Sequence, residues 1–273
     1  MPADSTVLGA GPGDPELITV KGSNRLAAAE IIIWASSLVP SELLRYKNDS
    51  ATVFDSAGMT LEDVLEVYSR SGNSSRIVRL HSGDPSVYGA IQEQIDFCIQ
   101  SQLEFEIVPG VTSLAAAAAI LQREFTIPAL SQSVIFTRLA GKTKASMPER
   151  ESVSAFAKIG GTLGIFLSGA HPQQLQNELL CDGSAFNENT PAAIVIRATW
   201  EDEKVVKTTI GSLASEMASS GANRTVLVVV GEVLSGPTQR SHLYSPQYAH
   251  RFRKRSLSGT TSGRPTKIRP NDA

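Results

Sequence analysis

The sequence is poor in the features that mark several large classes of protein. Only two of its 273 residues are cysteine, Cys98 and Cys181, and they lie far apart, which excludes a disulfide framework and a cysteine-rich zinc site. No apolar run reaches the ~18–20 residues of a membrane-spanning helix, and the longest, 114–121, is mostly alanine. Residues 1–6 show no secretory signal pattern. We therefore expect a reduced, cytoplasmic protein without a membrane partner.

Positive charge is scarce in most of the chain. Residues 1–236 carry nine more acidic than basic side chains, whereas residues 237–273 carry seven more basic than acidic ones. Because nucleic-acid binding requires positive surface, this distribution disfavours a nucleic-acid partner. The basic end is rich in Ser, Gly, Thr, Pro and Arg, a composition typical of solvated chain ends, and it is expected to be a mobile tail.

Strand and helix patterns alternate along the first 125 residues. Within 61–70 the apolar residues recur at positions i, i+3, i+4 and i+7, the spacing of one helical face. The alternation favours a mainly parallel sheet covered on both faces. Short apolar strands are predicted at 6–8, 31–35, 52–54, 76–80 and 104–108, and helices at 16–29, 61–70, 89–100 and 112–121.

A different rhythm follows a break around Pro128. Two successive strands separated by the polar turn 201–203 predict an antiparallel hairpin, so this second sheet is expected to be mixed. Strands are predicted at 134–137, 162–167, 192–196, 204–210 and 225–230, and helices at 149–158, 173–180 and 213–219.

The sequence thus predicts an α/β protein built from two α/β domains. We place the N-terminal domain, with a mainly parallel sheet, at residues 1–125, the C-terminal domain, with a mixed sheet, at 126–236, and the tail at 237–273. The active site is expected in the cleft between the two domains.

Three glycine-containing loops follow predicted strands of the first half. They are Gly9–Asp14, Gly83–Tyr88 and Val108–Ser113. Because α/β proteins bind ligands at the carboxyl ends of strands, three such loops indicate one shared site, and glycine allows a ligand to approach the backbone closely. His81, directly before the second loop, is expected to be a packed residue rather than a ligand or a base.

The first loop is not a dinucleotide-binding motif. The pattern G-x-G-x-x-G requires glycine where Asp14 stands, and a carboxylate would repel a pyrophosphate. This disfavours a nicotinamide-dependent oxidoreductase, which stays an alternative, as does a binding module without catalytic activity. Asp14 itself has two interpretations, as the cap of the following helix or as a carboxylate directed into the cleft.

Taken in this order and at this spacing, the three loops resemble those of the tetrapyrrole (corrin/porphyrin) methyltransferase family. The resemblance implies a two-domain α/β fold and an enzyme that uses S-adenosyl-methionine as methyl donor, with S-adenosyl-homocysteine as product. Members that methylate different tetrapyrrole positions share these loops, and the residues after Gly83-Asp84-Pro85 distinguish among them. Further similar stretches lie at 38–40, 55–61, 79–90, 132–138, 165–168 and 197–200, so that the resemblance covers about residues 5–255.

The resemblance also implies where each part of the methyl donor binds. The second and third loops are expected to contact its methionine portion, two strands of the second half its adenine, and the first loop its methyl side. A small-molecule tetrapyrrole substrate and a homodimer are implied as well. The expected cofactor-binding residues are Pro12, Gly83, Asp84, Pro85, Val87, Tyr88, Thr112, Ser113, Phe166, Leu167, Ala193, Thr225 and Val226.

Methyl transfer from a sulfonium to an electron-rich carbon needs mainly orientation and the exclusion of water. We therefore expect neither a metal site nor a catalytic triad. Asp14 is the first candidate for a catalytic carboxylate, which would steady positive charge or accept a proton. Because the acceptor carries carboxylates, cationic residues near strand ends are expected to bind it. The candidates are Lys21, Arg138 and Arg197, for which an ordinary solvated charge is the alternative.

Overall fold

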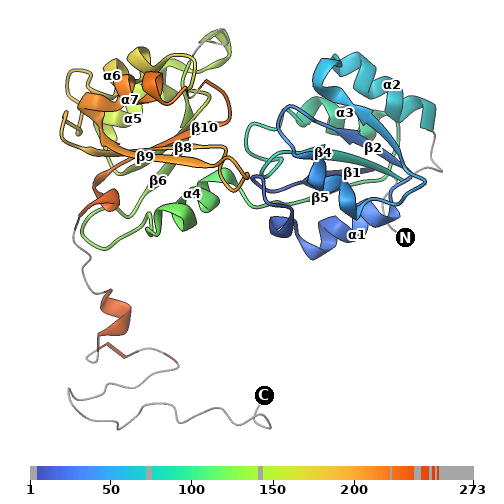
Figure 1. Cartoon of the computed structure of the whole chain (residues 1–273), viewed down its shortest axis with the longest axis horizontal. Helices are drawn as coiled ribbons and strands as arrows, with labels where there is room; N and C mark the ends of the chain where they lie inside the picture. The colour runs from blue at the N-terminus through green and yellow to red at the C-terminus, as the bar shows by residue number, and fades with distance from the viewer. Residues whose placement is uncertain are drawn as a thin grey trace.

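The chain folds around two five-stranded sheets that lie side by side (Figure 1). The computed structural model describes residues 5–71, 76–140, 144–221, 223–236, 241–245, 248–249 and 251. In the first sheet the strand order is β3-β2-β4-β1-β5 and every neighbouring pair is parallel. Its strands are β1 (Ser5–Gly9), β2 (Ile31–Trp34), β3 (Thr52–Asp55), β4 (Ile77–His81) and β5 (Phe105–Val108).

Helices cover both faces of this first sheet, as predicted for a parallel sheet. The helix α1 (Val20–Ala28) lies on one face, and α2 (Leu61–Ser71) and α3 (Gln92–Gln100) lie on the other (Figure 1). Leu26 of α1 packs in one buried cluster with strand residues, and Tyr68 of α2 packs in a second cluster.

The second sheet is mixed, as the predicted hairpin indicated. Its order is β6-β7-β10-β8-β9, in which β6 and β7 are parallel and the other neighbouring pairs are antiparallel. Three helices, α5, α6 and α7, cover one face. These elements are β6 (Val134–Arg138), α5 (Val153–Ile159), β7 (Thr162–Phe166), α6 (Pro172–Leu179), β8 (Pro191–Ile196), β9 (Lys204–Thr209), α7 (Leu213–Ser219) and β10 (Val226–Val230).

The alanine-rich helix α4 (Ser113–Leu121) follows β5 in the chain but packs on the free face of the second sheet. Gly164 of β7 makes room for this helix, because a Cβ added there would lie 2.4 Å from Cδ1 of Leu114. The chain therefore passes from one sheet to the other just before α4. The domain boundary at residue 126 stays a prediction, but the packing places α4 with the second sheet.

Three predicted helices begin later than expected, and one of them, predicted from residue 89, begins at Gln92 as α3. Instead of one helix over 16–29, a 3-10 turn, η1 (Pro15–Leu17), precedes α1, because Thr19 starts a new helix by accepting a hydrogen bond from Gly22 N. Ser152 separates η6 from α5 in the same way. The other short 3-10 turns are η2 (Ser41–Tyr46), η3 (Ser56–Gly58), η5 (Lys144–Ser146), η6 (Glu149–Glu151), η7 (Ile210–Ser212), η8 (Glu232–Leu234) and η9 (His242–Tyr244).

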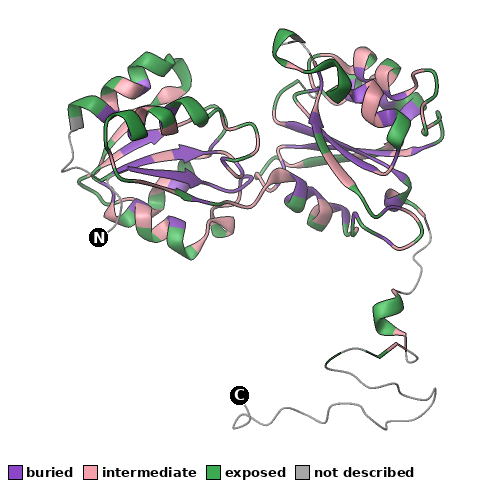
Figure 2. Ribbon diagram, turned by 180° about the vertical axis from the view of Figure 1, so that it is seen from behind, coloured by how far each residue is buried: buried purple, intermediate pink, exposed green. Residues whose placement is uncertain are grey.

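Buried residues gather in the strands of both sheets and on the helix faces that cover them (Figure 2). Across the described ranges no helix combines the length and the apolar composition needed to cross a bilayer. The predicted basic tail, 237–273, lies mostly outside the described residues.

Candidate active site

The three glycine-containing loops meet at one edge of the first sheet. They follow β4, β1 and β5, which are neighbours in the sheet, so their carboxyl ends lie together. The first and second loops pair directly: Gly11 N donates to Gly83 O at 3.2 Å and Gly83 N donates to Gly11 O at 2.8 Å. The shared location that the sequence predicted for these loops is thus present in the fold.

Glycine allows these loops to pack on one another. A Cβ at Gly9 would lie 2.6 Å from Gly110 N, and a Cβ at Gly110 would lie 2.2 Å from Gly83 O. At these two positions the close neighbour is therefore backbone of another loop. Gly83 differs, because its φ is +63° and a Cβ there would meet nothing closer than 3.9 Å. A Cβ at Gly83 would make only ordinary van der Waals contacts, with the backbone of Val111, Thr112 and Ser113 at the start of α4.

Asp84 joins the second loop to the third. Its Oδ2 accepts a hydrogen bond from Gly110 N at 2.9 Å, while its Oδ1 accepts from Ser86 N at 2.9 Å and from the Ser86 hydroxyl. Burial acts to raise the pKa of Asp84, but these hydrogen bonds to its charged form outweigh burial and hold that pKa below its ordinary value. Asp84 thus fixes two of the three loops relative to each other.

Asp14 caps the turn η1. Its Oδ1 accepts from Glu16 N at 2.8 Å, and its own backbone N donates to Oγ1 of Thr199 at 2.9 Å. Asp14 therefore caps the turn through Oδ1, and its second carboxylate oxygen, Oδ2, takes no part in the cap. Pro12, two residues earlier, is buried.

Residues of the second half also share one edge of their sheet. The strands β6, β7 and β8 end at this edge and the antiparallel β10 begins there, which brings Arg138, Phe166, Arg197 and Thr225 to the same side. Val226 follows Thr225 and pairs with Ile196, and Arg197 N donates to Thr225 O at 2.9 Å.

The two edges contact each other through aromatic side chains. The ring of Tyr88 in the second loop lies 5.3 Å from the ring of Phe166 at the end of β7. Partial burial raises the pKa of the Tyr88 phenol, and the positive charge of Arg138 acts in the opposite direction. Tyr88 remains 47% exposed and Leu167 63% exposed, so apolar surface stays accessible beside the loops.

The third loop leads into α4. Thr112 caps the helix, with its Oγ1 accepting from Ala115 N at 3.2 Å, and Ser113 is the first helical residue. The N-terminus of this helix, which carries the positive end of the helix dipole, lies next to Gly83.

In the second loop, Val87 N donates to Asp84 O at 3.1 Å and closes a turn around Pro85.

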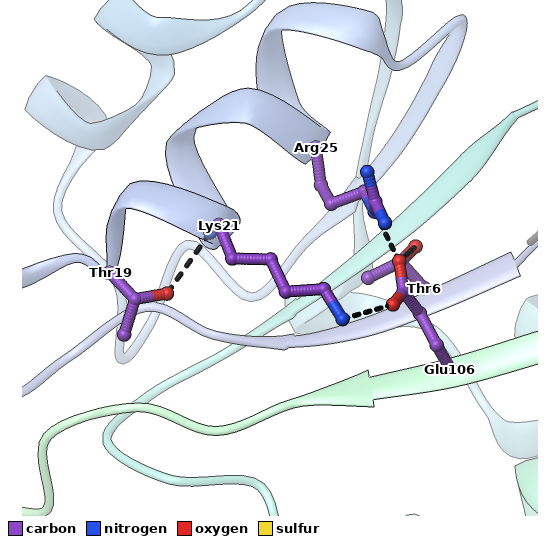
Figure 3. Close-up of polar contacts among 6 residues, drawn as sticks. Thr6, Thr19, Lys21, Arg25 and Glu106 are labelled. Atoms are coloured by element: carbon purple, nitrogen blue, oxygen red, sulfur yellow. Dashed lines mark hydrogen bonds and ion pairs between the residues drawn. The ribbon is translucent and has the colours of Figure 1, made fainter. Parts of the chain in front are cut away.

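Two predicted site residues lie away from these loops. Ala193 occupies the middle of β8, opposite Val229, and its side chain is buried in the cluster beneath α4. Lys21 of α1 forms an ion pair with Oε2 of Glu106 at 2.5 Å, and Arg25 binds the same carboxylate (Figure 3). Hydrogen bonds from Arg25, and less so from Lys21, lower the pKa of Glu106 despite its partial burial. Lys21 is therefore already ion-paired, although it shares the single carboxylate of Glu106 with Arg25.

Arg197 also has a partner. Its Nε lies 2.5 Å from Oδ1 of Asp202, and its guanidinium lies 3.8 Å above the ring of Trp200. Trp200 donates from Nε1 to Pro12 O at 3.0 Å. Trp200 belongs to the family-like stretch 197–200, but it was not among the predicted site residues.

His81 is packed, as predicted. It is 7% exposed, and burial, helped by the nearby charge of Arg79, lowers its pKa to about 3. The imidazole is therefore neutral at physiological pH. Within the part of the chain that the structure describes, no three His, Cys, Asp or Glu side chains gather in a way that could hold a metal ion.

The sequence profile of the family described as Tetrapyrrole (Corrin/Porphyrin) Methylases matches residues 6–214. The cobalt-precorrin-4 C(11)-methyltransferase of Methanocaldococcus jannaschii is 44% identical over 250 residues, which are 91% of this chain and 95% of that protein. The precorrin-4 C(11)-methyltransferase of Pseudomonas aeruginosa is 41% identical over 248 residues, which are 90% of this chain and 97% of that protein.

Solved structures agree with the sequence matches. A cobalt precorrin-4 methyltransferase, a cobalamin biosynthetic enzyme, superposes with a TM-score of 0.80 at 40% identity, covering 85% of this chain and 95% of that chain. The uroporphyrin-III C-methyltransferase from Thermus thermophilus, in complex with S-adenosyl-homocysteine, superposes with a TM-score of 0.70 at 25% identity, covering 84% of this chain and 98% of that chain. This chain therefore belongs to the tetrapyrrole (corrin/porphyrin) methylase family.

Proposed function

We propose that this protein transfers a methyl group from S-adenosyl-methionine to C11 of precorrin-4, giving precorrin-5 in cobalamin biosynthesis. The observation that carries the proposal is the meeting of the three strand-end loops with Phe166 of the second half. The acceptor is assigned from the relatives that are 44% and 41% identical and are named for methylation at this carbon.

The residues around Gly83 fit the methyl donor. Gly83 lies next to the N-terminus of α4, where backbone N–H groups and the helix dipole suit a carboxylate such as that of methionine. The exposed apolar surface of Tyr88 and Leu167 suits an uncharged adenosine. We propose that the cofactor residues expected from the sequence surround the bound donor, with Phe166 flanking it and Thr225 and Val226 near its adenine. Ala193 is the residue that the fold places least favourably.

Bound S-adenosyl-methionine supplies an electrophilic methyl group on a sulfonium. The chain's own contribution is to orient donor and acceptor at ~3–3.5 Å and to exclude water. Pro12 and Asp14 line the methyl side in this proposal. Oδ2 of Asp14, which the cap leaves unused, steadies the positive charge that passes to the acceptor or takes up its proton. Arg138, at the end of β6, binds a carboxylate of the acceptor.

Two further properties are proposed. A homodimer is proposed from the family resemblance, and its test is the molar mass measured by light scattering. A cytoplasmic location is proposed because Cys98 and Cys181 are free thiols in the structure.

Turnover tests the proposal directly. The protein is incubated with methyl-labelled S-adenosyl-methionine and, in parallel, precorrin-4, cobalt-precorrin-4 or uroporphyrinogen III. Methylation of precorrin-4 at C11 is expected. Cobalt-precorrin-4 is the alternative acceptor, because the relative that is 44% identical is named for it. Methylation of uroporphyrinogen III alone would contradict the proposed acceptor while leaving the methyl donor assigned.

A further inference from the structure

The loop between β8 and β9, residues 197–203, reaches across to the first loop of the other sheet. Two hydrogen bonds join the loops in opposite directions. Trp200 Nε1 donates to Pro12 O at 3.0 Å, and Asp14 N donates to Oγ1 of Thr199 at 2.9 Å. The first loop is therefore held by the second half on both sides of Gly13.

Gly13 provides the surface on which the indole rests. A Cβ at this position would lie 2.4 Å from Cδ1 of Trp200 and 2.9 Å from Ala198 O. Real Cβ atoms do not approach other atoms so closely, and both clashing groups are themselves held in place. The contact between the two loops therefore requires glycine at position 13.

Contacts within the 197–203 loop hold this loop in one conformation. Arg197 and Thr199 adopt φ values of +50° and +65°, a conformation that non-glycine residues adopt only where their surroundings enforce it. Thr199 N donates to Oε2 of Glu203 at 2.7 Å. The guanidinium of Arg197 covers the ring of Trp200 and pairs with Asp202. These contacts hold the indole ring of Trp200 in position against Pro12.

We propose that Trp200 is a positioning residue for methyl transfer. It touches neither donor nor acceptor in this proposal. Instead it holds the carbonyl of Pro12, and with it Asp14, at the place where the methyl group passes between them. The inference rests on the proposed function, because it assumes that the first loop lies on the methyl side.

The geometry predicts which kinetic constant changes. The second and third loops are joined by Asp84 and do not involve Trp200, so binding of the donor survives when Trp200 is changed. Transfer itself is sensitive to misplacement, since a shift of ~1 Å can reduce a rate by about 100-fold. A lower kcat with nearly unchanged cofactor affinity is therefore the expected signature.

Trp200→Phe is the test variant, because it keeps an aromatic ring but removes the N–H group. Trp34→Phe is the matched control. Trp34 also donates from Nε1 to a backbone carbonyl, that of Val39 at 2.9 Å, but both of those residues lie in the first half. We expect Trp200→Phe to lower kcat at least about tenfold and to change the dissociation constant of S-adenosyl-homocysteine less than about threefold. Trp34→Phe should change both values less than about twofold.

A second readout does not require the acceptor. The chain contains two tryptophans, so Trp34→Phe leaves Trp200 as the sole tryptophan and Trp200→Phe leaves Trp34. S-adenosyl-homocysteine is expected to change the emission and the acrylamide quenching of Trp200 in the first variant, and to leave Trp34 unchanged in the second.

The outcomes separate this inference from the proposed acceptor. If the wild type methylates no tetrapyrrole but S-adenosyl-homocysteine changes the emission of Trp200 alone, the acceptor is wrong and the coupling of Trp200 to the cofactor site stands. If Trp200→Phe turns over as fast as Trp34→Phe, or if the emission of Trp200 does not respond to S-adenosyl-homocysteine, the inference is overturned. Equal melting temperatures of the two variants ensure that a loss of folding does not explain the difference.

Discussion

The two sheets contribute different chemistry to the site because their topologies differ. In the all-parallel first sheet, β4, β1 and β5 end at the same edge. The loops that follow them meet there mainly through backbone groups, with hydrogen bonds at Gly11, Gly83 and Asp84. In the mixed second sheet, the same edge collects the ends of three strands and the beginning of a fourth. It presents side chains, above all Phe166 and Trp200. The first sheet thus provides a backbone cradle and the second provides contacts that close on it.

The glycines of the two sheets offer the sharpest way to test this contrast. Gly110→Ala places a methyl group 2.2 Å from Gly83 O, a backbone atom that cannot move without displacing the second loop. We expect S-adenosyl-homocysteine to bind at least about 100-fold more weakly, which corresponds to about 2.7 kcal/mol. Isothermal titration calorimetry measures this change.

Gly164→Ala is the control in the second sheet. Its added methyl group meets Cδ1 of Leu114 at 2.4 Å, and that atom is the end of a flexible side chain. We expect a loss of about 1–2 kcal/mol in stability with ligand affinity within about threefold of the wild type. Equal losses of affinity in both variants would contradict the separate roles of the two sheets.

Asp84→Ala should have the next largest effect, because it removes the connection between the second and third loops. Loss of hydrogen bonds to a charged group predicts a decrease of about 10-fold or more in affinity for S-adenosyl-homocysteine. Asp55→Ala is the matched control. Asp55 likewise accepts a hydrogen bond from the backbone N two residues ahead, Ala57, and another from the Ser36 hydroxyl, but it ends β3, the outermost strand of the sheet. The affinity of Asp55→Ala for S-adenosyl-homocysteine should stay within about twofold of that of the wild type.

The buried His81 predicts a pH dependence of stability that originates in the first sheet. Its pKa is lowered from 6.5 to about 3 in the folded protein. Between these values the unfolded chain takes up a proton that the folded protein does not, so stability falls as the pH falls through this window. Between about pH 6.5 and pH 5 the expected loss is about 2 kcal/mol.

Urea unfolding of the wild type and of His81→Gln checks this. Carboxylates contribute to both curves, so the difference between the two slopes isolates the histidine. The variant should lose about 2 kcal/mol less than the wild type over this interval. Parallel pH profiles would mean that His81 is hydrated and protonates normally in the folded protein.

The smallest effect is expected from Lys21→Ala. Its ammonium is already paired with Glu106 on the α1 side of β5, and an exposed ion pair contributes little. We expect kcat/KM for the acceptor to change less than about twofold, whereas Arg138→Ala should raise the KM of the acceptor about fivefold or more through loss of a charge-assisted contact. Steady-state kinetics with varied acceptor distinguishes the two. An equal effect of both variants would restore Lys21 as a substrate ligand.

Local features of the site could be predicted from the sequence because they depend on residues close together in the chain. Each strand followed by a glycine-containing loop is such a feature, and Gly9–Asp14 and Gly83–Tyr88 lie where the pattern placed them. The cap formed by Asp14 was one of the two interpretations that the sequence left open. Helix starts were less predictable, since Thr19 and Ser152 cap helices inside segments that read as continuous.

Contacts between distant segments could not be predicted. The hydrogen bond from Trp200 to Pro12 joins residues 188 positions apart, and the order of strands determines whether they meet. The same holds for Lys21, whose partner Glu106 becomes its neighbour only because β5 lies beside β1. The charge of Lys21 made it a candidate, but its ion pair with Glu106 cannot be seen in the sequence. Trp200 belongs to the family-like stretch 197–200, but that pattern does not show which distant backbone group its indole contacts.

The crystal structure of the complex with S-adenosyl-homocysteine tests the central claim most directly, namely that the strand-end loops of the first sheet hold the methyl donor and the second sheet closes on it. The ligand is expected beside Gly83, with its carboxylate at Thr112 and Ser113, its adenosine against Phe166, and its sulfur toward Pro12. A ligand bound elsewhere, for example in the pocket of about 430 Å³ lined by Trp34, Pro40 and Arg197, with the second and third loops uncontacted, would contradict this claim.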